Sequence, residues 1–243
     1  MALVLARSLI QHRAFDPSDV LLSYVEWWRR DGIDSGPTAG TVLQRIAMGV
    51  AAELAVQSVD RERGGLTGGC NPAHRATPLA MAAFLPGEGL AAAAIREAAL
   101  THQHPAARET SAAVVVLCRS LVMGMSWDAA RGAASNGRVT EIAEALLHPG
   151  AVAIGNGGYA PEALKAALHF VESAANVNDA LERAVLFAGP ANYCPVLVGA
   201  IGGARWGASS IDPRLLRNAA PSVQPTDIRA VAEVLANDWD HAD

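Results

Sequence analysis

The chain has 243 residues, a formal net charge of −5, 51% hydrophobic residues and 18% charged residues. This apolar, weakly charged composition excludes a disordered chain, and three cysteines are too few for a disulfide scaffold. The mild acidity argues against a nucleic-acid partner, which a basic patch would indicate. The longest apolar run, Cys194–Ala204, is too short to span a bilayer, and the N-terminal stretch is more typical of a helix than of a signal peptide. We therefore expect a cytoplasmic protein with no nucleic-acid or membrane partner.

Alanine and leucine dominate the chain, and the alternation typical of strands is scarce. No low-complexity linker divides the sequence, so we expect one compact all-α domain over residues 1–243, with about ten or more helices. In chain order the predicted helices cover 1–13, 17 to a stop at Gly32, a stretch after Thr38, 87–101, 105–124, 127–133, 139–147, 161–173, Asn176 or Asn178 to Phe187, 191–207, and a last one from Thr226.

Local signals support several of these helices. Asp16 is followed by proline and a further acid, which is typical of a capped helix start. The run Ala112–Cys118 is apolar all round and predicts a helix buried in the middle of a bundle. Gly199, Gly202 and Gly203 lack side chains, so a neighbouring helix can approach closely there.

Three connecting segments, at 64–72, 150–158 and 188–192, are richer in glycine than simple turns require. Glycine-rich loops before helices expose backbone N–H groups that bind phosphate or carboxylate. The simpler interpretation is that glycine only ends the preceding helix. Both interpretations stay open for each loop.

Eight fragments, in order along nearly the whole chain, resemble the ADP-ribosylglycohydrolase family, all-α enzymes that remove ADP-ribose from modified side chains. The resemblance implies a single orthogonal helical bundle, here without the family's N-terminal segment. The fragments are Met1–Leu9, Phe15–Pro17 with Tyr24 and Glu26-Trp27, Asp34-x-Gly36-x-Thr38, Gly69–Leu79, Thr101–Pro105, Gly157-Gly158-Tyr159 with Ala163–Leu168, Ala180–Val185 and Gly199–Ala204.

The chain departs from this family where the family binds metal. The resemblance implies two magnesium ions, held by an N-terminal Thr-Asp-Asp motif and by two aspartates before the Gly/Ala helix. Here Pro190 and Asn192 stand at those two aspartate positions, and Tyr193 replaces a threonine. Magnesium requires oxygen ligands, above all carboxylates. We therefore expect a degenerate member with no dinuclear magnesium centre, no other metal and no cofactor.

The resemblance also implies that the three glycine-rich loops meet at one cleft. Arg75 would add a fixed cation with five donors there, suited to an anionic group. The ligand-binding candidates are Asp34, Asn71, Arg75, Gly155, Asn156, Gly157, Gly158 and Tyr159, and the catalytic candidates are His74, Asn192, Tyr193 and Cys194.

Several other residues have a structural interpretation that outweighs the functional one. Cys70, like Cys194, is more typical of a small buried hydrophobe than of a nucleophile. His102 and His104 have a ligand-like spacing but precede a helix start, which favours capping or turn packing. Asp60 and Glu62 are typical of a solvated helix end. Trp27 and Trp28 are more often core residues than a platform for a ligand.

Two functions from different classes follow from these observations. The first is a binding protein that keeps a pocket for an anionic ADP-ribose-like or nucleotide-like small molecule. The second is a repurposed, metal-independent enzyme acting on another small molecule in the same cleft. Replacement of the metal ligands by polar residues, rather than by alanine or glycine, supports the second. Because one fold hosts many functions, the resemblance alone does not decide between them.

Overall fold

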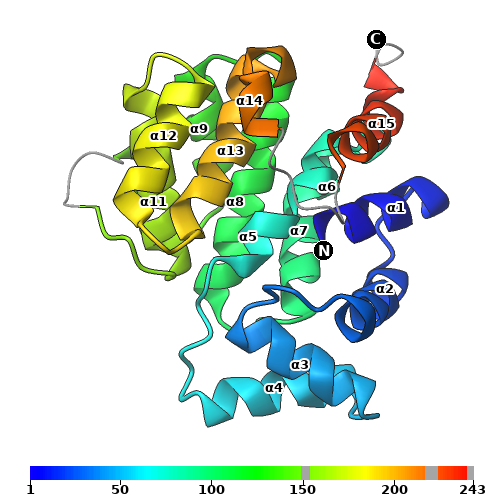
Figure 1. The fold of residues 1–243 in the computed structure, drawn as a ribbon. Coiled ribbons are helices and arrows are strands. Elements are labelled where there is room, and N and C mark those ends of the chain that lie inside the picture. The colour runs from blue at the N-terminus through cyan, green and yellow to red at the C-terminus, as the bar shows by residue number, and fades with distance from the viewer. Residues whose placement is uncertain (149–153, 217–223, 240–243) are drawn as a thin grey trace.

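The computed structural model describes residues 1–148, 154–216 and 224–239. Over these residues the chain forms 15 α-helices, one 3-10 helix and no strand, which confirms the all-α prediction (Figure 1). The first eight helices are α1 (Ala2–His12), α2 (Pro17–Arg30), α3 (Pro37–Ala47), α4 (Ala52–Glu62), α5 (Asn71–Arg75), α6 (Thr77–Met81), α7 (Gly87–Ala99) and α8 (Pro105–Val122). The others are α9 (Trp127–Ser135), α10 (Thr140–Leu147), α11 (Ala160–Ser173), α12 (Val177–Ala188), α13 (Tyr193–Trp206), η1 (Ala208–Ser210), α14 (Pro213–Leu216) and α15 (Pro225–Ala236).

Most predicted helix ends lie within two residues of the observed ones, but the prediction lacks the short elements η1 and α14 and two further features. The stretch after Thr38 forms two helices, because the chain turns at Gly49, whose φ of 91° favours glycine. The first glycine-rich segment is followed by two five-residue helices, α5 and α6, each with proline in its first turn. Of the second glycine-rich segment, residues 150–153 lie outside the described residues.

Helix α8 is the central element of the bundle. Ala112, Val114, Leu117 and Cys118 are all buried, as the apolar run predicted. The helix packs against α5, α6, α7, α9, α10, α11 and α13. Residues on α5 are therefore backed by the most buried helix of the fold.

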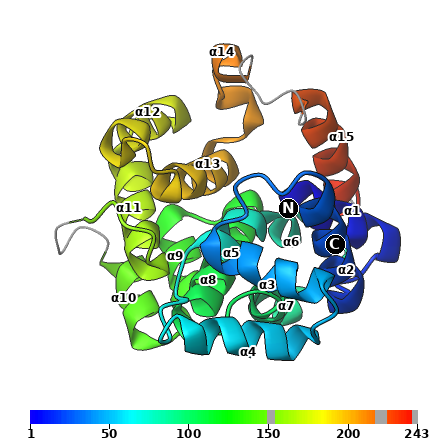
Figure 2. The ribbon, with the colours of Figure 1, turned by 60° about the horizontal axis from the view of Figure 1, so that its bottom comes forward.

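The remaining helices lie on either side of α8 and α5. In Figure 1, α11, α12 and α13 form one side of the molecule, and α1, α2 and α15 form the other. Helices α3 and α4 pack against each other at the bottom of Figure 1 and come forward in Figure 2. One cluster of buried residues runs through the two sides, and a small second cluster of Val42, Ala55, Val56 and Val59 joins α3 to α4.

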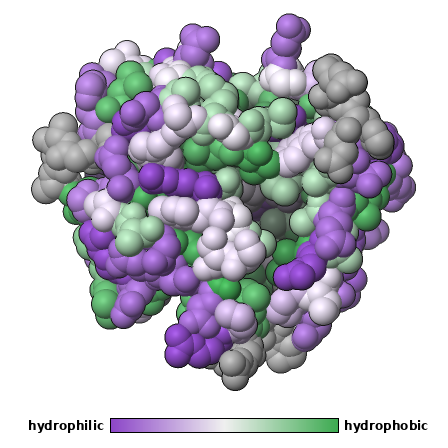
Figure 3. Space-filling model, turned by 90° about the horizontal axis from the view of Figure 1, so that it is seen from above, coloured by the Kyte–Doolittle hydropathy of each residue, from purple (hydrophilic) through white to green (hydrophobic). Residues whose placement is uncertain are grey.

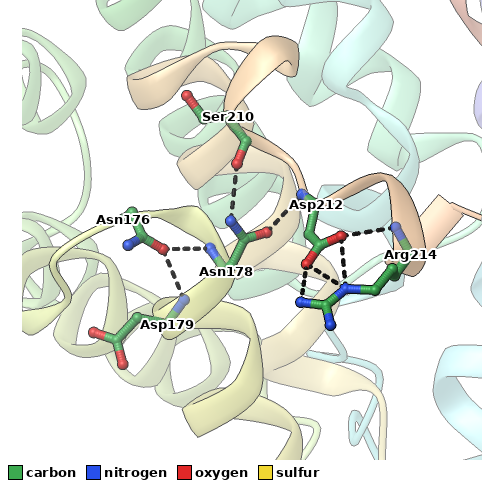
Figure 4. A network of polar contacts seen from close by, with 6 residues as sticks. All are labelled: Asn176, Asn178, Asp179, Ser210, Asp212 and Arg214. Atoms are coloured by element: carbon green, nitrogen blue, oxygen red, sulfur yellow. Dashed lines mark hydrogen bonds and ion pairs between the residues drawn. The ribbon is translucent and has the colours of Figure 1, made fainter.

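A polar network fastens the segment after α13 to the start of α12 (Figure 4). Asn176 caps α12 by accepting the backbone N–H groups of Asn178 and Asp179, each at 3.0 Å. The Asn178 amide donates to the carbonyl of Ser210 and accepts the N–H of Asp212, each at 2.9 Å. Of the two capping residues that the sequence left open, Asn176 is thus the cap, and Asn178 holds the following segment.

The glycines of α13 only partly allow the close approach that the sequence predicted. A Cβ at Gly202 would lie 3.2 Å from Val177 of α12, and one at Gly199 would lie 3.7 Å from Leu181. At Gly203, however, a Cβ would meet nothing within 4 Å, so the prediction is wrong there. In the described part of the chain, no helix combines the length and the apolar character needed to cross a bilayer.

Candidate functional site

The glycine-rich loops meet, as the resemblance implied. An isolated β-bridge joins Gly69 to Tyr159, and the Cys70 N–H donates to the Gly158 carbonyl at 3.0 Å. The Tyr193 ring closes this junction, since a Cβ at Gly158 would lie 2.9 Å from a ring atom. Absence of a side chain at Gly158 thus lets an aromatic ring pack directly on the loop.

The segment before α13 is also tied to α5 and to the loop after α2. His74 Nε2 lies 2.9 Å from the carbonyl oxygen of Tyr193. The Asn192 amide donates to Asp34 Oδ2 at 2.7 Å, across 158 residues of sequence. These contacts place Asp34, His74 and Asn192 around one space.

That space is a cavity of about 240 Å³. It lies where α1, the end of α2, α5 and the start of α13 come together. Five candidates from the sequence, Asp34, Asn71, His74, Arg75 and Asn192, are in its wall. We call it the polar cavity; its lining is Met1, Ala2, Trp27, Ile33, Asp34, Ser35, Asn71, His74, Arg75, Asn192 and Val196.

Arg75 is held by the core rather than free in the cleft. Its side chain is 4% exposed, and its Nε donates to Glu97 Oε1 at 2.6 Å. Its Nη2 donates to Thr101 Oγ1 at 2.8 Å, and the Tyr24 hydroxyl donates to the same Glu97 oxygen at 2.7 Å. Burial alone would lower the pKa of Arg75, but the Glu97 carboxylate raises it above its usual value. Arg75 therefore has a structural role, and its replacement by alanine should lower the melting temperature markedly.

The same network leaves three buried polar atoms without a hydrogen-bond partner among the described residues. They are Arg75 Nη1, Glu97 Oε2 and His102 Nε2. A buried group left unsatisfied costs about 1–3 kcal/mol. Arg75 alone of the three also lines the polar cavity, so this wall contains a buried cation with an unused N–H group.

His74 is in its neutral form at neutral pH. Burial lowers its pKa below the usual value, against the opposing effect of the hydrogen bond to Tyr193. A carbonyl oxygen can only accept, so Nε2 carries the proton and donates to Tyr193. Nδ1 of the neutral ring then has a free lone pair, which is the requirement for a general base.

The loop 154–159 does not line the polar cavity, so the predicted ligand-binding residues Gly155–Tyr159 lie outside it. A Cβ at Gly155 or Gly157 would lie 3.4 Å from a Glu162 carboxylate oxygen. Glu162 is in the first turn of α11, so a side-chain carboxylate already faces the helix N-terminus that an anion would use. Asn156 is exposed.

Tyr159 also faces away from the polar cavity. Its hydroxyl donates to Glu141 Oε2 at 3.0 Å, and its ring packs edge-on against His104 with centroids 6.3 Å apart. Burial and the bond to Glu141 raise its pKa. Tyr159 thus joins the loop to α10.

The two cysteines beside the cavity have the wrong ionisation for a nucleophile. Cys70 and Cys194 are 1% and 2% exposed. Burial raises the pKa of Cys70 to about 12 and that of Cys194 to about 11. Reactive cysteines have a lowered pKa, so the structure favours the hydrophobic interpretation of both.

Other sequence interpretations hold. His104 caps α8, because its Nδ1 accepts the Ala106 N–H at 3.1 Å. His102 is fully buried and its Nδ1 lies 2.8 Å from Thr101 Oγ1. Asp60 and Glu62 belong to the end of α4, where they bind Thr67 and Arg45.

Two residues of the site were not expected from the sequence. The sequence favours a core position for both tryptophans, but Trp27 is only half-buried and lines the polar cavity, whereas Trp28 packs against the core. Glu97 has a sequence signal, since it follows Leu90 and Ala94 at helical spacing on a buried face. A lone carboxylate on such a face needs a buried cationic partner, which here is Arg75.

Comparison with known proteins shows the family of the chain. The family model for ADP-ribosylglycohydrolase matches residues 1–243. The chain belongs to the ADP-ribosylglycohydrolase family. A solved structure described as an ADP-ribosylglycohydrolase-related protein complex is 26% identical, with a TM-score of 0.77, and the match covers 97% of this chain and 78% of that chain. No curated protein gives a significant match.

The polar cavity does not suit the family's pair of magnesium ions. Among the described residues that line it, Asp34 is the one carboxylate, and one of its oxygens already accepts the Asn192 amide. Within the described ranges there is no group of three His, Cys, Asp or Glu that could hold a metal ion. Pro190 has no ligand atom in its side chain, and Asn192 has one neutral oxygen.

Proposed function

We propose that this chain binds an anionic small molecule, ADP-ribose-like or nucleotide-like, in the polar cavity, without magnesium-dependent hydrolysis. The observation that carries the proposal is the wall residue Arg75, a fully buried guanidinium whose Nη1 has no partner. A phosphate or carboxylate oxygen is the natural acceptor for such a group. Glu97 and Thr101 fix the guanidinium, so little freedom would be lost on binding.

The neutral and acidic groups of the wall could form hydrogen bonds with the phosphate and the sugar hydroxyls of such a ligand. Asn71 and Ser35 offer hydrogen-bond donors without adding negative charge. Asp34 has one oxygen engaged by Asn192, and its other oxygen can accept a ligand hydroxyl. The half-buried Trp27 adds an apolar face to the same wall.

The proposal is tested by the thermal stability of the protein with ADP-ribose, once in magnesium and once in EDTA. A ligand that binds only the folded state at about 100 times its Kd adds roughly 2.7 kcal/mol of stability. We expect the same upward shift in both buffers, and no release of ADP-ribose from modified arginine. A shift that requires magnesium, or magnesium-dependent release, would contradict the proposal.

A second candidate is a metal-independent enzyme that uses the same cavity, and His74 favours it. The neutral His74 ring is fixed through Nε2 and leaves Nδ1 as a base. Its Gln variant, His74→Gln, keeps a donor for Tyr193 but removes this lone pair. If the chain turns over a small-molecule substrate, His74→Gln should lower kcat by about 10²–10⁴-fold at nearly unchanged KM. Equal kcat in the variant would exclude His74 as the base.

We also propose that the chain is one domain and acts in the cytoplasm. Its three cysteines are all free and buried, which suits a reducing compartment.

A further inference from the structure

A second and larger hollow lies next to the polar cavity, between α1, the end of α2, α6 and α15. It has a volume of about 590 Å³, within the roughly 300–1,000 Å³ typical of small-molecule sites. Its wall is mostly aliphatic and includes Leu3, Val4, Met81, Ile228, Val231 and Leu235. We call it the apolar groove. The view from above in Figure 3 shows a hollow near the middle of this face with hydrophobic residues on its walls.

The polar cavity and the apolar groove adjoin each other. Met1, Ala2, Trp27 and Ile33 line both spaces. A ligand whose anionic group lies at Arg75 would therefore have its remaining atoms directed past the Trp27 ring toward α15.

The groove offers little to a hydroxylated ligand. Its charged wall residues are Arg7, Arg30 and Asp31, and Arg30 is already paired with Asp31 at 2.9 Å. Thr77 is a further polar wall residue. A sugar placed there would exchange its water contacts for aliphatic side chains, at a cost in free energy. A hydrocarbon placed there would gain free energy for each methylene that leaves water.

We propose that the ligand of this site is amphipathic, with an anionic group in the polar cavity and an aliphatic chain in the apolar groove. This inference rests on the proposed function, because it takes Arg75 as the anion donor. It keeps the anionic group of the proposed ligand and replaces its sugar part: the ligand class is a phosphate monoester of an alkyl group.

The test is a calorimetric titration with methyl, butyl and octyl phosphate, each below its aggregation concentration. The affinity should rise about three- to fourfold for each added methylene until the groove is filled. Octanol, which has the chain but no charge, should bind far more weakly than octyl phosphate.

A matched pair of variants on α15 tests whether the aliphatic chain of the ligand lies in the apolar groove. Ile228 lines the groove and is 46% exposed, whereas Val234 is 48% exposed and does not line it. Both are exposed enough to accept a carboxylate without loss of the fold. Ile228→Asp should abolish the dependence of affinity on chain length, and Val234→Asp should keep it.

Four results would count against the inference or the proposed function beneath it, in distinguishable ways. Equal affinities for methyl and octyl phosphate would refute the apolar groove as a binding site and leave the proposed function intact. If the affinity of Ile228→Asp still rises with the length of the alkyl chain, that alkyl chain must lie outside the apolar groove. Octanol binding as tightly as octyl phosphate would refute the amphipathic ligand, and a failure of methyl phosphate and ADP-ribose to bind would refute the proposed function as well.

Discussion

The loop 154–159 and the polar cavity both have features of an anion site, but a carboxylate faces the loop and a buried guanidinium lines the cavity. The loop precedes a helix N-terminus and is rich in glycine, yet Glu162 faces it from the first turn of that helix. The polar cavity has no glycine-rich backbone facing it, but its wall contains Arg75 with an unpaired Nη1. An unpartnered guanidinium N–H group, rather than glycine content, therefore distinguishes the candidate anion site here.

The glycines of the two regions have a steric role instead. At Gly158 the Tyr193 ring packs on the backbone, and at Gly36 the Asn71 amide does so. In each case a glycine lets another chain segment approach. The family resemblance implied that the glycine-rich segments meet, whereas their glycine content did not indicate what they bind.

The largest expected effect is the loss of stability when the buried ion pair of Arg75 and Glu97 is broken. Glu97→Gln leaves the Arg75 charge buried without its partner, so unfolding free energy should fall by about 3–5 kcal/mol. Unfolding in denaturant measures this fall in free energy. Glu88→Gln, which removes an exposed carboxylate from the first turn of the same helix, should lower the unfolding free energy by no more than about 1 kcal/mol. An equal midpoint for Glu97→Gln and wild type would show that the ion pair does not hold Arg75.

The next effect compares Gly36, which packs against the wall residue Asn71, with a glycine of the loop 154–159. Gly36 has φ 73° and ψ 157°, a conformation almost restricted to glycine, and its Cβ would lie 2.7 Å from the Asn71 amide. Gly36→Ala should cost about 1–3 kcal/mol in unfolding free energy. Gly157→Ala meets only an ordinary contact with Glu162 and should cost less than half as much. A larger loss for Gly157→Ala would reverse the comparison.

A pH effect follows from the buried network behind the cavity. Burial and the nearby positive charges, Arg75 first, hold the pKa of His102 well below its usual value of about 6.5. The unfolded state then binds the proton more readily, so stability is full above pH 6.5 and falls below it. The loss from this group should reach at most about 1.4 kcal/mol per pH unit. His102→Gln should remove that part of the slope in unfolding measured from pH 7 to 5, and an unchanged slope would refute the assignment.

The smallest effect tests whether Glu162 occupies the anion position of the loop. A carboxylate in the first turn of a helix typically contributes about 0.3–1 kcal/mol. Glu162→Gln should lower stability by that amount at low salt, and added phosphate should restore part of it by taking the vacated position. Glu182→Gln, in the middle of α12, is the control. Phosphate that stabilises wild type and Glu162→Gln equally would contradict this role.

Periodicity and caps were enough to predict most of the fold. Asp16, Asn176 and the apolar run Ala112–Cys118 each indicated an element that the structure contains. The break at Gly49 and the short helices α5 and α6 were not predicted, because a single glycine or a five-residue helix gives no periodic signal.

The candidate site was only half predictable for a different reason. Asp34, Asn71, His74, Arg75 and Asn192 do share one cavity, as their place in the family motifs implied. The partner of Arg75 is Glu97, 22 residues away, and the neighbour of the loop is Glu162. Such pairings arise from tertiary packing, and no local pattern encodes them. Only the structure therefore shows which charged side chains are paired at a site and which are not.

The central claim, that an anion binds in the polar cavity, is tested most directly by placing a negative charge in its wall. Asn71 lines the cavity, and Asn71→Asp keeps its size and leaves the network of Arg75 and Glu97 untouched. Calorimetric titration with ADP-ribose in EDTA should show affinity reduced about tenfold or more, roughly 1.4 kcal/mol, while the exposed control Asn136→Asp binds as wild type does. Equal affinities for wild type and Asn71→Asp would contradict the claim.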